Sequence, residues 1–355
     1  MKKSIILTMV IGLIILFSAS HHALASDYQI CVFQESAPGM EDFAFLGTID
    51  IFDFSSVSAA DVYRFGNPHG ASYNGDVWWP GVAPNAIEET SQLFVVDTND
   101  GSGVSLFIVH DKYQNGEGGN ARMQLNLSGD TARVLVNDDP GEPIIVSGRR
   151  TQFNTRHDWL PCCTDGGVIG TLEGNWSMDV QFLSVDTDRI TDWQATSADG
   201  SMIPLVLELE RRVRLQPCPI VAVDIKPLSC PNPLNVKKKG VLPVAILGTD
   251  ELDVTTIDPA SVRLEGVAPL RWSIEDVATP FTPFTGKVNA TDCTTAGPDG
   301  MVDLTLKFSA SSIVSTLGSV NDKEVKVLLY LTGKLYDGSS IVGEDVVVIK
   351  KNQNK

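Results

Sequence analysis

Short runs of β-branched and aliphatic residues, each ended by Gly, Pro, Asn or Asp, recur along this chain and restrict the folds open to it. In the C-terminal half they include IVAVDIK, GVLPVAIL, SVRLEGV, MVDLTLKF, VKVLLYLTG and EDVVVIK. Runs of this composition are typical of strands, and the alternation of apolar and polar residues in MVDLTLKF predicts a strand with one buried face. Six or seven strands in about 130 residues favour an immunoglobulin-like sandwich. Only SASSIVSTLGSV is predicted to be helical.

The N-terminal half shows the same pattern with longer loops. Hairpins are predicted around Asn99-Asp100-Gly101 and around Ser128-Gly129-Asp130, because both are turn-forming sequences between strand-like runs. The later runs, which we expect to form a meander, are WSMDVQFLSV, ITDWQATSA and MIPLVLELERRVRL. The N-terminal half is therefore predicted to be a β domain as well.

The first residues have the three parts of a secretory signal peptide. Lys2 and Lys3 precede an apolar stretch that runs to Phe17, and Ala23-Leu24-Ala25 forms a cleavage site. We expect cleavage after Ala25, so that the protein is secreted or periplasmic. No second apolar stretch follows, which predicts that the chain is not inserted in a membrane after cleavage.

The remaining residues are long enough for two domains. Gln216-Pro217-Cys218-Pro219 separates a charged run from an apolar one, and prolines at such a place are typical of a domain boundary. The predicted organisation is a signal peptide at 1–25, an N-terminal domain at 26–216 and a C-terminal module at 219–351.

Acidic residues dominate the charge, and they are unevenly placed. The chain has a formal net charge of −17. Between Ser26 and Cys218 there are 28 acidic and 11 basic residues, whereas from Pro219 onward there are 16 and 14. A strongly negative surface repels phosphate backbones and anionic lipids. We therefore exclude nucleic acid and membrane surfaces as expected partners.

All six cysteines lie in the part that is predicted to be exported. An even number in an oxidising compartment indicates disulfides, although six cysteines allow 15 pairings. We favour a bond between Cys230 and Cys293, because both occupy turn-like positions in the second half. The partners of the others stay open, and these are Cys31, Cys162, Cys163 and Cys218. The C-x2-C spacing of a zinc site is absent.

The C-terminal half resembles a known family. IKPLSCPNP and KGVLPVAILGT are long ordered strings within a match that runs from Val221 to Lys351. This segment is similar to an uncharacterised β-module that recurs at the C-terminal ends of secreted and surface proteins of environmental bacteria. The resemblance implies an accessory or structural role, and it brings no reaction and no named ligand.

A shorter resemblance lies in the N-terminal half. GTLEGNWSMDVQF and RITDWQATSADGSMIPL contain Trp176 and Trp193, and they are similar to the closing strands of the calcium-containing jelly-roll domain that follows subtilisin-like protease domains. This resemblance implies a jelly-roll. The predicted fold class is thus all-β, with two tandem β-sandwich domains, the first jelly-roll-like and the second immunoglobulin-like.

Two acidic loops are candidate calcium sites, since calcium takes six to eight oxygen ligands. One is DCTTAGPDGMVD, with Asp292, Asp299 and Asp303, and the alternative is an Asp-Gly turn pinned by a disulfide at Cys293. Related modules more often have Asp-x-Asn-Gly-Asp-Gly-x-x-Asp here, which this sequence does not. The other is DTNDGSG, with Asp97 and Asp100, for which the alternative is a solvated hairpin turn.

A long segment without periodicity, between Phe65 and Glu89, carries a candidate ligand site. Its residues that suit stacking on a sugar ring and bonding to its hydroxyls are Trp78, Trp79, Tyr73, Asn74 and Asp76. The alternative is that the two tryptophans cover the end of the core. Either carbohydrate or protein is an expected partner.

Catalytic motifs are scarce in this sequence. HDWLPCCTDGGVIG contains His157 beside two cysteines, but oxidised sulfur cannot act as a nucleophile. No H-E-x-x-H, G-x-S-x-G or Walker sequence occurs in a suitable context. The leading hypothesis is an exported, non-catalytic binding or scaffold protein of the cell exterior, stabilised by disulfides and by calcium if either loop binds it. The alternative is a secreted hydrolase that uses carboxylates of the N-terminal domain.

Overall fold

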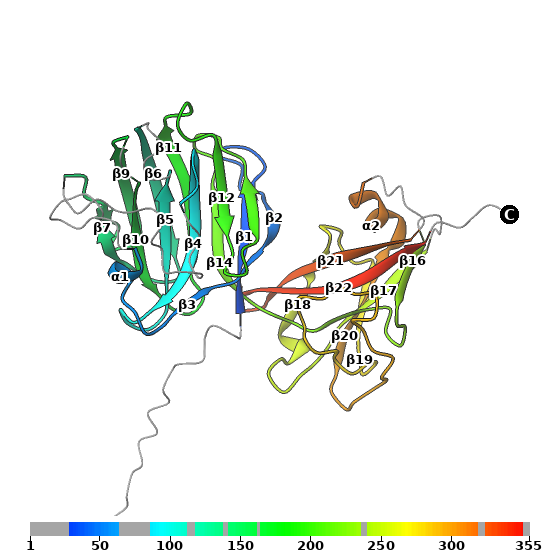
Figure 1. Ribbon diagram of the computed structural model, residues 1–355. Helices are drawn as coiled ribbons and strands as arrows, with labels where there is room; N and C mark the ends of the chain where they lie inside the picture. Colours follow the sequence, from blue (N-terminus) through cyan, green and yellow to red (C-terminus); the bar gives the residue numbers. More distant parts are fainter. Residues whose placement is uncertain are drawn as a thin grey trace, which may run out of the picture.

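The computed structural model describes residues 28–63, 86–111, 118–137, 141–161, 164–235, 240–318 and 324–350. Strands fill most of this part of the chain, and they form four sheets arranged as two β-sandwiches (Figure 1). The predicted all-β fold of tandem sandwiches is confirmed. Among the described residues, neither α-helix has the length and apolar character that a membrane span requires.

The first sandwich contains every strand from β1 to β14. One sheet has the order β2-β1-β14-β11-β6-β9-β8, with β1 (Tyr28–Glu35), β2 (Phe43–Ile49), β6 (Gly119–Ser128), β8 (Ile145–Ser147), β9 (Gln152–Trp159), β11 (Ser177–Val185) and β14 (Val213–Pro219). The other has the order β13-β12-β4-β5-β10-β7, with β3 on β4, and comprises β3 (Phe52–Phe54), β4 (Thr90–Thr98), β5 (Val104–His110), β7 (Arg133–Asn137), β10 (Asp165–Leu172), β12 (Asp192–Thr196) and β13 (Met202–Leu205).

The core of this sandwich lies between its two sheets. β6 shows how the sequence builds it, because Met123 and Leu125 face inward while Arg122 and Gln124 alternate outward. The largest fully buried side chains of this core include Trp176, Trp193, Phe153 and Phe182. β4 and β5 are buried along nearly their whole length, since a second apolar cluster with β3 and α1 (Ala59–Tyr63) covers their outer side.

One of the two predicted hairpins is correct. β4 and β5 pair as antiparallel neighbours around Asn99-Asp100-Gly101. The hairpin predicted around Ser128-Gly129-Asp130 is wrong, because β6 pairs with β9 and β11 whereas β7 pairs with β10 in the opposite sheet. The predicted meander is also wrong, since β11 and β12 belong to different sheets. Strand-like runs of similar composition can join either sheet, so the sequence around each run does not determine which strands pair.

The first and last strands of this sandwich are neighbours. β1 pairs with β14 from Tyr28 opposite Pro219 to Gln34 opposite Val213. A disulfide joins Cys31 to Cys218, whose Cα atoms are 5.7 Å apart. The segment Gln216–Pro219 is therefore the end of a strand, and β15 begins four residues after it at Val223.

The second sandwich pairs two smaller sheets. One has the order β15-β17-β20-β19 and comprises β15 (Val223–Ile225), β17 (Val241–Ile246), β19 (Arg271–Glu275) and β20 (Asp303–Ser309). The other has the order β16-β22-β21-β18 and comprises β16 (Asn232–Asn235), β18 (Ile257–Leu264), β21 (Glu324–Leu335) and β22 (Ser340–Lys350). Apolar residues of both sheets form its core.

Short helices complete this sandwich. Besides a 3₁₀ turn at Val254–Thr256, it contains α2 (Ala310–Thr316), which begins where Ser309 accepts a hydrogen bond from the N–H of Ser312. This helix falls within the run SASSIVSTLGSV, where the sequence predicts one.

A long loop between β19 and β20 is held by a buried lysine. The Nζ of Lys287 lies 3.1 Å from Asp345 Oδ1 and donates to the carbonyl oxygens of Val223 and Glu344. The lysine and Asp345 are both almost completely buried. The same loop is tied to the start of β16 by a disulfide between Cys230 and Cys293, the pair favoured from the sequence.

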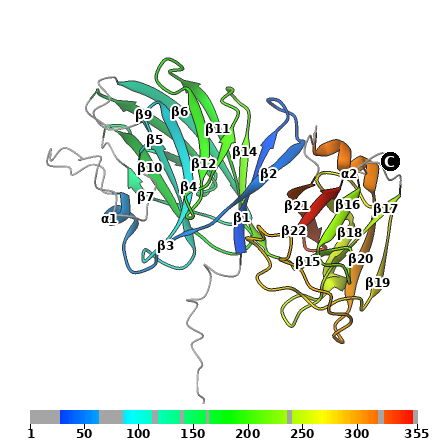
Figure 2. The same ribbon diagram turned by 45° about the vertical axis from the view of Figure 1, so that its right-hand side comes forward.

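The two sandwiches meet at the side of the first that carries β2, β1 and β14 (Figure 2). Phe45 packs edge-on against Tyr330 at a ring separation of 5.9 Å, and Val342 packs against the Cys31–Cys218 disulfide. The Gln216 amide donates to the Ser340 hydroxyl, and the Asn175 amide donates to the Ser339 hydroxyl at 2.7 Å. Apolar packing and hydrogen bonds thus join the two bodies.

Candidate functional site

The residues predicted to stack on a sugar lie outside the described part of the chain. These are Trp78, Trp79, Tyr73, Asn74 and Asp76. The same holds for Cys162 and Cys163. The aromatic platform stays a prediction.

The carboxylates of the first candidate calcium loop accept bonds from main-chain N–H groups. Asp292 binds the N–H groups of Val288 and Asn289, and Asp299 binds that of Met301. Asp303 is completely buried, and its carboxylate accepts from N–H groups of three residues, Gly248, Val277 and Ala278. Each carboxylate has its own set of donors, as expected of turns in a loop.

In the second loop, Asp100 accepts a bond from the N–H of Ala59 at the start of α1, and Asp97 belongs to β4. Within the described ranges, no three His, Cys, Asp or Glu side chains are grouped in a way that suits a metal ion. Calcium binding stays a prediction at both loops.

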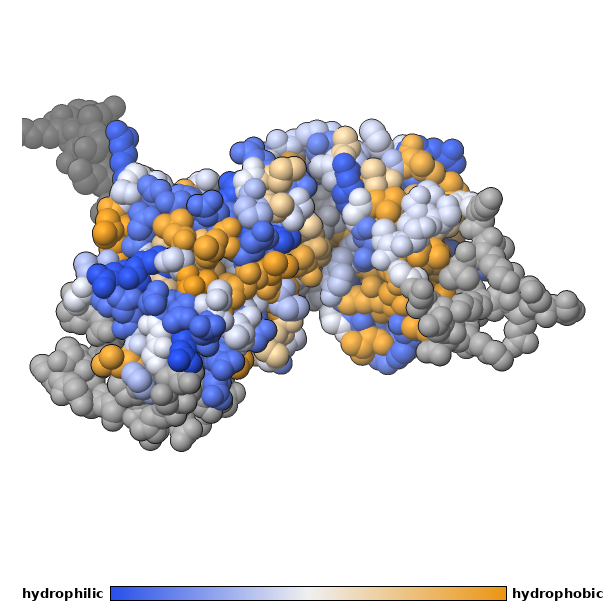
Figure 3. Space-filling view, turned by 90° about the horizontal axis from the view of Figure 1, so that it is seen from above, coloured by the Kyte–Doolittle hydropathy of each residue, from blue (hydrophilic) through white to orange (hydrophobic). Residues whose placement is uncertain are grey.

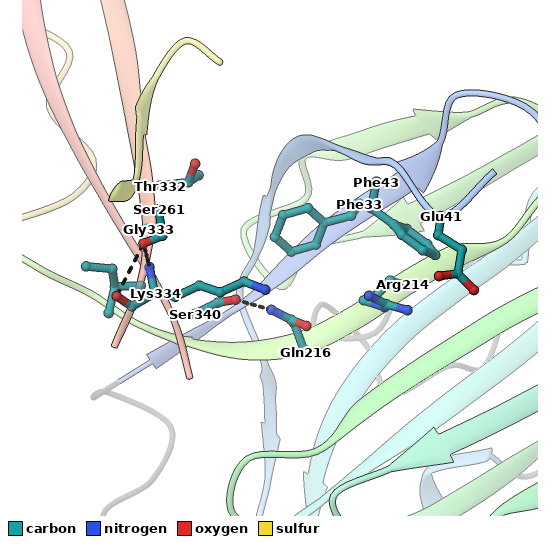
Figure 4. Close-up of a pocket in the computed structure, with 11 residues that line it drawn as sticks. Phe33, Glu41, Phe43, Arg214, Gln216, Ser261, Thr332, Gly333, Lys334 and Ser340 are labelled. Atoms are coloured by element: carbon teal, nitrogen blue, oxygen red, sulfur yellow. Dashed lines mark hydrogen bonds between the residues drawn. The ribbon is translucent and has the colours of Figure 1, made fainter. Parts of the chain in front are cut away.

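The structure reveals a groove between the two sandwiches that the sequence did not indicate. Figure 4 shows its walls, and Figure 3 shows the notch between the two bodies. It has a volume of about 290 Å³. One wall consists of Phe33, Glu41, Phe43, Arg214 and Gln216, and the other of Ser261, Thr332, Gly333, Lys334, Ser340 and Ile341.

Strand alternation places the first wall. Along β14, Val213 and Leu215 face the core, so Arg214 and Gln216 face outward toward the second sandwich. Arg214 is opposite Asp179 on β11, and its Nε and Nη2 lie 2.6 and 2.8 Å from the two carboxylate oxygens. The guanidinium carbon also lies 3.9 Å from the centre of the Phe43 ring. A bidentate ion pair and a cation–π contact together fix this arginine.

A further ion pair supports the same wall. Arg212 is bonded to the buried carboxylate of Glu35, and its guanidinium lies 5.4 Å from the Phe43 ring. Hydrogen bonding to Glu35 raises the pKa of Arg212 above its ordinary value. The Phe43 ring is thus held between β2 and two fixed cations.

The second wall comes from the β21–β22 hairpin and β18. Gly333 is opposite Ile341, and Lys334 is opposite Ser340. The N–H of Lys334 donates to the Ser261 hydroxyl at 2.8 Å, while the lysine side chain is exposed. Gln216 donates to the Ser340 hydroxyl, and this bond crosses from one sandwich to the other (Figure 4).

The groove is lined by aromatic rings, hydrogen-bond donors and a carboxylate. Phe33 and Phe43 supply aromatic surface, and Arg214, Lys334 and Gln216 supply hydrogen-bond donors. Among the described residues that line it, Glu41 carries the only carboxylate. Glycoside hydrolysis normally requires two carboxylates about 5 to 9.5 Å apart.

A second hollow, of about 430 Å³, lies on the outer side of the β17–β20–β19 sheet. Its lining includes Leu228, Glu275, Asp276, Val277 and Lys307. The two oxygens of Asp276 accept bonds from the N–H groups of Asp299 and Gly300, which close one side. This hollow belongs to a single sandwich.

A polar cluster is buried at one end of the first core. The rings of His110 and His157 are 4.9 Å apart, and Nδ1 of His157 lies 3.2 Å from Asp165 Oδ1. Trp159 stacks on His110 and donates to Asp111. Burial, together with the nearby His157, holds the pKa of His110 well below its ordinary value.

The two sandwiches are expected to respond to acid in opposite directions. Unfolded His110 binds a proton near pH 6.5 and the folded group does not, so the first sandwich should lose stability as pH falls below about 6.5. In the second, burial and the charge of Asp345 raise the pKa of Asp224 to about 7. The folded state therefore takes up a proton before the unfolded state does, and stability should rise as pH falls from 7 toward 5.

Thermal unfolding between pH 7.5 and 5 measures both effects, each at most about 1.4 kcal/mol per pH unit. In tryptophan fluorescence, Trp159, Trp176 and Trp193 report the first sandwich, and Trp272 on β19 reports the second. His110→Phe and Asp224→Asn are the matched variants. Each should reduce the pH dependence of the unfolding temperature of its own sandwich. Transitions that move in the same direction would contradict this assignment.

Comparisons with known proteins supply no family. No family model matches the chain, and no curated protein matches it. Among solved structures, the type II cohesin dyad from the adaptor ScaA scaffoldin of Acetivibrio cellulolyticus is 9% identical, with 74% of this chain and 97% of that one covered and a TM-score of 0.19. The Streptococcus agalactiae AgI/II polypeptide BspA C-terminal domain is 11% identical, with 73% and 99% covered and a TM-score of 0.17. Likenesses at these TM-scores carry no argument about this chain.

Proposed function

We propose that this chain is an exported, non-catalytic binding or scaffold protein of the cell exterior, and that it holds a carbohydrate or protein ligand in the groove between its sandwiches. The observation that carries the proposal is the groove itself. Residues of both sandwiches line it, and Gln216 and Ser340 are bonded across it. Two disulfides support the exported location, since such bonds persist in oxidising compartments.

The groove's chemistry supports a ligand with both apolar and polar faces. The Phe33 ring and the fixed Arg214–Phe43 pair suit the flat face of a sugar ring or an aromatic side chain. Glu41 and Lys334 stand on opposite walls and suit hydroxyls or peptide groups between them (Figure 4). Since Arg214 is held in place by Asp179, little side-chain entropy is lost at this position when a ligand binds.

A glycan array and an array of extended peptides, each probed with the labelled chain from Ser26 onward, test the proposal. For a bound ligand, we expect Lys334→Ala and Glu41→Ala each to weaken binding by about tenfold, because each removes a charged hydrogen-bonding group. Both side chains are exposed, so folding should be unaffected.

Lys326→Ala and Glu251→Ala are the matched controls, since both are exposed on the second sandwich and do not line the groove. They should leave affinity unchanged. If neither groove variant changes the affinity for a ligand, that ligand binds outside the groove. Cleavage of a bound glycan would contradict a non-catalytic role.

A further inference from the structure

The edge strand β19 of the second sandwich has a self-complementary sequence. It is the last strand of the order β15-β17-β20-β19, so one side of its backbone has no neighbouring strand in the described sheet. All five of its residues, Arg271 to Glu275, are exposed. Figures 1 and 2 both show β19 at the margin of this sandwich. Natural sheets usually shield such an edge, because unpaired N–H and C=O groups can pair with another chain.

The apolar residues of β19 are not covered by the rest of the sandwich. Trp272 and Ile274 are 50% and 46% exposed, although they lie opposite the fully buried Leu306 and Leu304 on β20. Leu270, directly before the strand, is 62% exposed. The apolar side of the sheet is therefore exposed to solvent at its last strand, β19.

The charged residues of β19 lie beside charges of the same sign. Arg271 is opposite Lys307, and Glu275 is opposite Asp303. Arg271 makes no ion pair with any residue that the structure describes. Like charges directly opposite one another in a sheet are destabilising. An acidic residue of another chain would therefore stabilise the Arg271 end of β19, and a basic residue would stabilise the Glu275 end.

A second copy of the same strand meets both requirements. When two β19 strands pair antiparallel about Ser273, Arg271 of each lies opposite Glu275 of the other, and Trp272 lies opposite Ile274. Two ion pairs and two aromatic–aliphatic pairs then form together, which are the cross-strand pairs that stabilise sheets. We propose that the chain associates with a second copy of itself through β19, joining two four-stranded sheets into one of eight strands around a twofold axis.

Among the strands that the structure describes, β8 is also an edge strand with every residue exposed, and it lacks this complementarity. β8, residues Ile145 to Ser147, ends a sheet of the first sandwich, and its three residues are also exposed. It is shorter and contains no charged residue, so self-pairing would form no ion pair. This strand therefore serves as a control edge for the proposal.

Sedimentation equilibrium of the chain from Ser26 onward, up to about 1 mM because a strand-edge contact is small, tests the proposal. We expect a monomer–dimer equilibrium. Arg271→Glu places four carboxylates at the interface and should weaken the dimer by about tenfold or more. The double variant Arg271→Glu/Glu275→Arg exchanges the two charges, so the ion pairs between copies can form again, and it should dimerise more tightly than Arg271→Glu alone.

The control Ile145→Arg, on β8, should leave the equilibrium unchanged. Circular dichroism of each variant checks that the fold is kept. A chain that stays monomeric at about 1 mM overturns the proposal. So does a dimer that Ile145→Arg disrupts and Arg271→Glu does not, or a double variant that dimerises no more tightly than Arg271→Glu alone.

Discussion

Replacing Lys287 with Met is expected to lower the free energy of unfolding of the second sandwich by about 3 to 5 kcal/mol. The ammonium group is almost completely buried and contacts Asp345 Oδ1 and the carbonyls of Val223 and Glu344. Met keeps much of the side-chain volume but leaves the carboxylate of Asp345 buried without its counter-ion. An unpaired buried charge costs far more than a lost surface pair.

The cost of Lys287→Met should depend on pH, because Asp345 can take up a proton. Burial raises the pKa of Asp345 although Lys287 acts to lower it, so without the lysine this carboxyl should take up a proton more readily. The loss caused by Lys287→Met should therefore be smaller at pH 5 than at pH 8. Denaturant unfolding at both pH values measures it.

Two variants complete the design. Adding Asp345→Asn to Lys287→Met removes the stranded charge and should recover about half of the loss. Lys326→Met changes an exposed lysine that donates to the carbonyl of Val288 and attracts the exposed Asp292, and it should cost less than about 1 kcal/mol. An equal cost for the two lysines would show that the buried pair does not stabilise the loop.

Removal of the Cys31–Cys218 disulfide is the second change with a large expected effect. The bond closes a loop with a sequence separation of 187 residues, and the loss of this constraint from the unfolded chain is worth about 5 kcal/mol in the chain-entropy model. The double variant Cys31→Ala/Cys218→Ala removes the bond, and alanine is chosen over serine because serine would bury two hydroxyl groups. Urea unfolding followed by tryptophan fluorescence should show the loss in the first sandwich.

The second disulfide provides the comparison. Cys230 and Cys293 are separated by 63 residues, so their removal should cost about 1 kcal/mol less under the same model. That loss should appear in the unfolding of the second sandwich. If the shorter loop costs more, native-state contacts rather than chain entropy dominate the effect of these bonds.

Local patterns predicted the strands well, because burial on one face leaves a period of two in the sequence. β6 shows this alternation clearly, whereas β20, predicted to have one buried face, also buries Asp303 and Thr305 on its polar side. Cys230 and Cys293 flank turn-like segments that the fold brings together. The assignment of β6 and β7 to opposite sheets was not predictable, since either sheet could accept an apolar strand after the Ser128-Gly129-Asp130 turn.

The groove could not be predicted from local sequence patterns, for a different reason. Its walls combine β1, β2 and β14 with β18, β21 and β22, so Phe33 and Lys334 are about 300 residues apart in sequence but line one space. A weak local signal existed in VRLQPC, where the alternation places Arg214 and Gln216 outward. The sequence provided no means of knowing that a second sandwich faces them.

The β1–β14 pairing also determines how the first sandwich would respond if the protein were pulled from both ends. The chain enters this sandwich at Tyr28 and leaves at Pro219, which are opposite each other, and a covalent link between Cys31 and Cys218 lies just inside them. Tension would pass through that link directly to the second sandwich. The polypeptide between the two cysteines would carry almost no load, so any groove wall or loop built from it would keep its shape while the molecule is under mechanical strain.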